Sequence, residues 1–131
     1  MFLNKITIFN VHEVEQDGET SLEYHRNVVD DVFYYTEKIV VQEGNGEKYS
    51  TAHHVIFSNI ALQNYVPYKD FTFEQGKYSL SENDIIVLDE VEDITDLKDL
   101  EKSKVDYFLI KTISDNTYGN EELQNVEVTN W

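Results

Sequence analysis

The sequence predicts a mostly β protein, arranged as a small β-barrel or sandwich with one short helix and a long central loop. Nine Tyr and seven Phe accompany many Val and Ile residues, and aromatic and β-branched side chains favour strands. Short turn signals separate the runs of these residues, as they do in hairpins. A chain of 131 residues is expected to form one domain, here residues 1–131.

The first half of the chain predicts four strands, and the last three of them predict a meander. The predicted strands cover residues 5–11, 20–29, 31–42 and 48–58. Asp17-Gly18 separates the first two strands, and Asp-Gly is a strong hairpin signal. Gly44-Asn45-Gly46 separates the last two, and Gly and Asn tolerate the positive φ that tight turns need.

The second half predicts one helix among further strands. Residues 84–91 predict a strand that is buried on both faces, because Ile85-Ile86-Val87-Leu88 is a continuous apolar run. Apolar residues at helical spacing predict a short helix over residues 95–102. Strands over residues 105–113 and 123–129 complete the set, with a turn at residues 115–120 between them.

Charge excludes several classes of partner. The formal net charge is −16, from 10 Lys and Arg against 26 Asp and Glu. Nucleic-acid binding depends on cationic contacts to phosphate, and anionic membranes attract basic segments. We therefore expect no specific DNA binding and no membrane partner. The chain has no Cys, which excludes disulfides and Cys-based metal sites.

The sequence offers no convincing catalytic or metal-binding constellation. His53 and His54 are adjacent on a predicted strand, so their side chains point to opposite faces and cannot easily share a metal. The acids from Asp89 to Asp93 lack the alternating ligands and central Gly of a calcium loop. A nucleophile elbow and a Gly-rich phosphate loop are both missing. We expect no enzyme, no catalytic residues, no cofactor and no metal.

The central loop holds the candidate interface residues. It spans residues 59–74, includes the single Pro of the chain and is rich in aromatic side chains. Long ordered loops in small domains often carry binding. The interface candidates are Tyr65, Pro67, Tyr68 and Phe71 in this loop and Tyr118 in the later turn. The alternative is that the loop folds over the end of the barrel as additional core.

An ordered set of short motifs resembles a family of small phage proteins. The motifs run in order through most of the chain: Tyr24-His25-Arg26, Val66-Pro67, Asp84-Ile85-Ile86-Val87, Asp93-Ile94-Thr95-Asp96-Leu97, Asp115-Asn116-Thr117-Tyr118-Gly119, Glu122-Leu123-Gln124 and Val126-Glu127-Val128. Together they resemble the minor capsid or head–tail connector proteins of phages and prophages of Gram-positive bacteria. Two features depart from the family pattern. Asn83-Asp84 replaces a common Gly-Asp, which is expected to alter a turn, and the usual basic tail is missing after Trp131.

The resemblance implies a structural role in a virion, with assembly in the cytoplasm of the bacterial host. The expected partners are further copies in a homo-oligomeric ring, a hexamer or dodecamer, and the neighbouring portal, adaptor or tail proteins. DNA would pass through the ring without specific binding, because acidic side chains facing the channel repel phosphate.

The alternative function is an acidic DNA-mimic inhibitor of a DNA-binding enzyme. It is motivated by the alternating acids Glu13, Glu15, Asp17 and Glu19, which on a straight strand would form a row of negative charges. The predicted turn at Asp17-Gly18 is expected to scatter that row.

Overall fold

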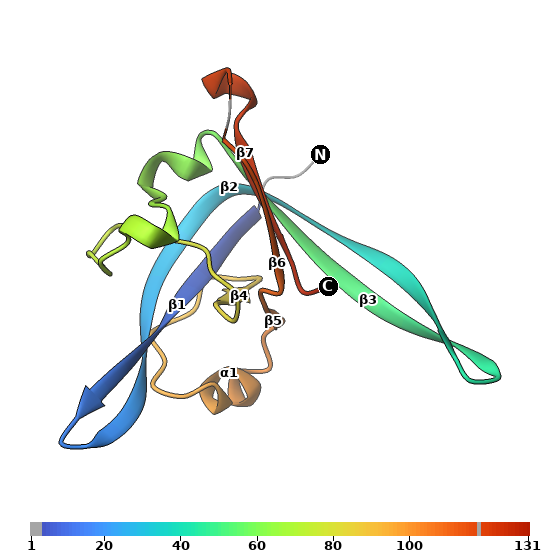
Figure 1. The fold of residues 1–131 in the computed structure, drawn as a ribbon, viewed down its shortest axis with the longest axis horizontal. Helices are drawn as coiled ribbons and strands as arrows, with labels where there is room; N and C mark the ends of the chain where they lie inside the picture. The colour runs from blue at the N-terminus through green and yellow to red at the C-terminus, as the bar shows by residue number, and fades with distance from the viewer. Residues whose placement is uncertain (1–3, 118) are drawn as a thin grey trace.

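The computed structural model describes residues 4–117 and 119–131 and confirms a mostly β fold (Figure 1). The described residues form a seven-stranded antiparallel sheet in the order β5-β4-β1-β2-β3-β7-β6. The strands are β1 (Asn4–Gln16), β2 (Glu19–Glu43), β3 (Gly46–Ser58), β4 (Ile85–Val87), β5 (Tyr107–Leu109), β6 (Thr112–Asn116) and β7 (Asn125–Thr129).

Strand β2 is continuous where the sequence predicted two strands, and a bulge lies between the two predicted halves. Ile6 of β1 pairs with Val29, whereas Asn4 pairs with Val32, so β2 carries one additional residue on its side of the ladder. Asp31 takes φ of 63° there, a left-handed conformation that Asp tolerates better than most residues. The bulge bends β2, so its two halves form hairpins that point in different directions (Figure 1).

Both hairpin turns lie where the sequence predicted them. In the first hairpin, Asp17 and Gly18 both have positive φ, 54° and 80°, as a type I′ turn requires. In the second hairpin, Gly44 has φ of 59° and Asn45 does not have positive φ, which fits a type II′ turn. Primed turns match the right-handed twist of the strands, so the strands of both hairpins stay paired up to their turns.

The sheet is coiled, but the pairing of the described strands does not close it into a barrel. Its two edge strands, β5 and β6, follow each other in the chain and replace the single strand predicted over residues 105–113. Between them, the N–H of Ile110 donates to the carbonyl of Asp84 at 2.9 Å and that of Lys111 donates to Thr129 at 2.8 Å. The chain thus crosses from one edge of the sheet to the other within two residues.

The coiled sheet surrounds one core cluster and presents a second cluster on its other face. The rings of His53 on β3 and Phe108 on β5 stack with centroids 5.6 Å apart, although three strands separate β3 from the β5 edge in the sheet order. On β1, Ile8 faces the first cluster and Phe9 faces the second, as the two-residue period of a strand requires. Ile85, Ile86 and Val87 are all buried, as predicted for this apolar run.

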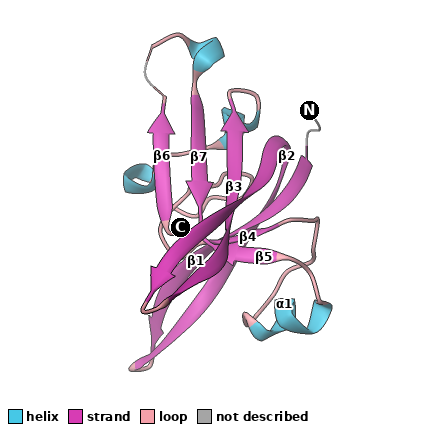
Figure 2. Ribbon diagram, turned by 90° about the vertical axis from the view of Figure 1, so that its right-hand side faces the viewer, coloured by secondary structure: helices cyan, strands magenta, loops and turns pink. Residues whose placement is uncertain are grey.

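Helix α1 (Lys98–Ser103) covers the second cluster and begins three residues later than predicted. The cause is Asp99, whose carboxylate accepts hydrogen bonds from the N–H groups of Thr95 and Asp96 at 3.0 and 3.3 Å. Thr95 is therefore a donor to Asp99, and the first helical turn lies further along the chain. Leu100 is buried against Phe9 and its neighbours. Figure 2 shows α1 beside β4 and β5, away from β6 and β7.

Candidate assembly surface

The central loop divides into residues that pack inward and residues that face outward. It contains two 3₁₀ helices, η1 (Ala61–Asn64) and η2 (Tyr68–Asp70). Tyr65 is half-buried and packs against Tyr78, with ring centroids 5.9 Å apart, and burial raises the pKa of the Tyr65 hydroxyl. Phe71 packs on Phe73 at 4.7 Å. The predicted alternative, a loop that adds to the core, therefore fits Tyr65, whereas Phe71 packs on Phe73 and on the ring of His25 outside the two core clusters.

Tyr68 and Pro67 are the interface candidates that face solvent. Tyr68 is 58% exposed and lies in η2, directly after the exposed Pro67. The fifth candidate, Tyr118, lies outside the described residues. The outward part of the loop is therefore a small surface around η2, on the side of the molecule opposite the β2–β3 hairpin (Figure 1).

The hairpin of β2 and β3 forms a long arm that the sequence analysis did not single out. We call residues 35–53 the β2–β3 arm. The pairing of β2 with β1 ends at Val32, and the pairing of β3 with β7 ends at His54. Beyond these points β2 and β3 pair with each other as far as Glu43 and Gly46. The eight residue steps from Tyr35 to Glu43, at about 3.4 Å each, give a projection of roughly 27 Å. Figure 1 shows the arm extending away from the body.

The β2–β3 arm exposes apolar side chains on both of its faces. Val40 and Tyr49 are directly paired on one face and are 51% and 65% exposed. Ile39 and Val41 lie on the opposite face, and both are partly exposed. The signal in the sequence is Ile39-Val40-Val41, an uninterrupted apolar run that breaks the alternation of a strand with one solvated face. A two-stranded ribbon with this pattern is marginal in water unless another surface covers it.

A polar cluster fixes the base of the arm to β7. The hydroxyl of Tyr35 donates to Oε1 of Glu127 at 2.8 Å, and this hydrogen bond raises the pKa of Tyr35. His54 lies parallel to the Tyr35 ring at 4.5 Å, with Nδ1 3.2 Å from Oε1 of Glu127 and Nε2 3.3 Å from Oε1 of Glu37. His53 points to the opposite face, as predicted, where its Nδ1 lies 2.7 Å from the hydroxyl of Tyr34.

The other charged groups considered as candidate sites do not gather into one cluster. The turn at Asp17-Gly18 splits the acidic row, as predicted, because Glu19 pairs with Gln16 and lies on the face opposite Glu15. Asp89 and Glu90 are exposed, and the side chain of Asp89 accepts a hydrogen bond from the N–H of Glu90 at 2.8 Å. Within residues 4–117 and 119–131, no three His, Asp or Glu side chains are placed to hold a metal ion.

Asp84 is a buried carboxylate that ties the segment just before β4 to β1. Its Oδ1 accepts from the N–H of Val11 at 2.9 Å and its Oδ2 accepts from Nδ2 of Asn10 at 2.8 Å. The same Nδ2 donates to the carbonyl of Ser79 at 2.7 Å. Desolvation raises the pKa of Asp84 to about 6, although these hydrogen bonds favour its charged form. The arrangement holds three chain segments together.

The chain belongs to a protein family without an assigned function. Residues 2–130 match the family described as "Family of unknown function (DUF6751)". No curated protein and no solved structure matches the chain. The described part of the chain contains no helix that is long and apolar enough to cross a membrane.

Proposed function

We propose that the protein is a structural subunit of a phage or phage-like particle. In this role it is a neck component between head and tail and forms a ring of copies around the DNA channel, a hexamer or a dodecamer. Its neighbours are portal, adaptor or tail proteins. It assembles in the cytoplasm of the bacterial host and remains in the virion. The resemblance of its ordered motifs to head–tail connector proteins motivates this role.

The observation that carries the proposal is the shape of the subunit. A small body extends the β2–β3 arm by roughly 27 Å, and this arm exposes Val40 and Tyr49. Only the base of this ribbon, where Ala52 is buried and the ring of His53 stacks on Phe108, contributes to the core of its own chain. In an assembly it contacts a neighbouring subunit, and apolar aromatic contacts of this kind supply most of the binding energy of interfaces.

The charge of the chain fits a channel that DNA must cross. A ring of subunits, each with a formal charge of −16, repels phosphate wherever acidic side chains face the channel. The same charge makes the subunits repel one another. This repulsion is screened over about 8 Å at physiological ionic strength, so apolar contacts and salt together favour assembly. The DNA-mimic alternative gains no support, because Glu15 and Glu19 lie on opposite faces of their hairpin.

Mass spectrometry of purified particles tests the role. Particles are induced from the bacterium that carries the gene, purified on a density gradient and digested. The proposal predicts this chain in a fixed ratio of six or twelve copies per particle, measured against the major capsid protein. Its absence from intact particles, or a single copy in each, would show that it is not a ring component. The DNA-mimic inhibitor would then become the preferred function.

A further inference from the structure

The β2–β3 arm differs in charge from the rest of the chain. Residues 35–53 contain two Lys against three Glu, whereas the whole chain contains 10 basic residues against 26 acidic ones. Lys38 and Lys48 lie on opposite faces of the arm, so each face carries one positive charge next to exposed apolar side chains. A nearly neutral arm with a cation on each face is the part of this molecule that a second, strongly acidic copy repels least.

A surface with complementary properties lies at the bend of β2. We call it the β2 shoulder. It is a pocket of about 240 Å³ with an acidic rim and an exposed apolar residue at its edge. Asp30 and Asp31 form the acidic part of the rim, and Ile60, which is 57% exposed, lies just before η1. Asp30 is held by one exposed ion pair with Lys5 at 3.7 Å, and such a pair is readily exchanged for another.

We infer that the β2–β3 arm of one copy docks on the β2 shoulder of a second copy. Tyr49 and Val40 cover Ile60, and Lys38, which shares their face of the arm, approaches Asp30 and Asp31. The partner is another copy of this chain because its acidic, partly apolar shoulder matches the only long, nearly neutral projection among the described residues. This inference rests on the proposed ring function and names the contact that builds the ring.

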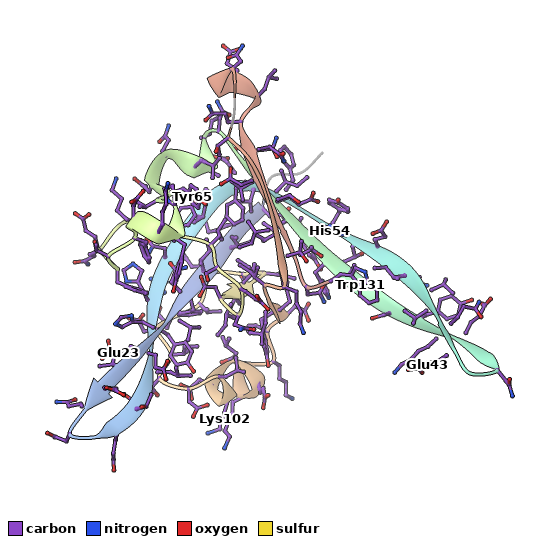
Figure 3. All side chains as sticks on the ribbon, in the orientation of Figure 1. Glu23, Glu43, His54, Tyr65, Lys102 and Trp131 are labelled. Carbon is purple, nitrogen blue, oxygen red and sulfur yellow. The ribbon has the colours of Figure 1, made fainter. Side chains whose placement is uncertain are left out.

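The placement of the two surfaces makes the contact head-to-tail. The arm extends to one side of the body, and the central loop, which contains Ile60, lies on the other side (Figure 1). Figure 3 labels Glu43 near the far end of the arm and Tyr65 on the opposite side of the body. Different patches therefore meet in each contact, and repeated contacts of this type close into a ring when the rotation between subunits allows it.

A negative charge added to the arm tests the contact without particles. Tyr49→Asp puts an acid against the acidic shoulder and removes an exposed aromatic ring. We expect the dissociation constant of the oligomer, measured by light scattering at high salt, to rise by on the order of tenfold or more. Leu22→Asp is the matched control. Leu22 is 52% exposed on the other hairpin, and its replacement by Asp adds the same charge. Equal effects of the two variants would contradict the inference.

Disulfide trapping identifies the partner surface directly, because the natural chain has no Cys. Tyr49→Cys and Ile60→Cys proteins are mixed and oxidised at high protein concentration and high salt, with circular dichroism to check that each is folded. We expect the mixed disulfide between Tyr49→Cys and Ile60→Cys proteins to form in higher yield than either homodisulfide. It should also exceed the mixed disulfide formed when Tyr49→Cys is combined with Leu22→Cys as a control. Predominant Tyr49→Cys homodisulfide would mean a symmetric contact and would overturn the inference. A chain that stays monomeric and uncrosslinked would overturn it as well, whereas the proposed function fails separately if particles lack the chain.

Discussion

Replacing Asp84 by Asn is expected to change how stability depends on pH. Burial raises the pKa of Asp84 from 3.8 to about 6, so the folded state binds this proton more tightly than the unfolded chain does. The stability from the bound proton is fully present below pH 4 and is lost as the pH rises through 6. A difference of about two pKa units corresponds to about 3 kcal/mol. About 1.4 kcal/mol of this lies between pH 5 and pH 8.

Urea unfolding at pH 5 and pH 8 measures the effect. The Asp84→Asn variant loses the proton-linked term, so its stability relative to the natural chain should rise by about 1.4 kcal/mol between pH 5 and pH 8. Its absolute stability at pH 5 should be lower, because an amide offers one oxygen to two donors, the N–H of Val11 and Nδ2 of Asn10. Glu82→Gln, exposed in the same turn, is the control. An equal stability difference between Asp84→Asn and the natural chain at pH 5 and pH 8 would show that Asp84 does not take up a proton in this range.

Four further predictions concern single sites and salt. Tyr78→Phe removes the buried hydrogen bond from the Tyr78 hydroxyl to Ala61, 2.6 Å long, and should cost about 1–3 kcal/mol in urea unfolding. Asp31→Val should cost about 1–2 kcal/mol more than Asp31→Gly, because φ at this position is 63°. Tyr68→Ala should weaken assembly at unchanged melting temperature, whereas Tyr65→Ala should lower the melting temperature. A lower melting temperature for Tyr68→Ala, with unchanged assembly, would show that Tyr68 is not at the interface. Assembly of the purified chain should strengthen as salt shortens the Debye length from about 30 Å to about 3 Å, as measured by sedimentation.

Local sequence signals were sufficient for the two hairpin turns and most strands, but not for the bend of β2. They also missed the change of sheet edge between β5 and β6, where one strand was predicted over residues 105–113 and β6 extends to Asn116 in the turn predicted over residues 115–120. Asp17, Gly18 and Gly44 determine their turns through positive φ angles that few other residues adopt. The break predicted between residues 29 and 31 is a bulge, because an Asp in a left-handed conformation permits a bend without ending the strand. Similarly, Asn83 takes φ of 74° in the turn before β4, a left-handed conformation that Asn tolerates better than most residues.

The arm could not be predicted as a surface because exposure depends on what lies beside each strand. Ile39-Val40-Val41 is typical of a buried strand, and only the structure shows that, among the described residues, no third strand pairs beside it and that Val40 is 51% exposed. The division of the central loop depends on tertiary contacts too. Tyr65 and Tyr68 are three residues apart and chemically identical, yet Tyr65 packs on Tyr78 and Tyr68 is exposed.

Cryo-electron microscopy of the neck of purified particles would show whether this chain forms a ring between head and tail. We predict density that fits this chain, with the β2–β3 arm of each subunit lying on the β2 shoulder of the next and acidic side chains facing the channel. A neck fully explained by other proteins, with no density for this fold, would contradict the structural role. A ring of this chain whose arms contact a different protein would keep that role and contradict the arm-to-shoulder contact.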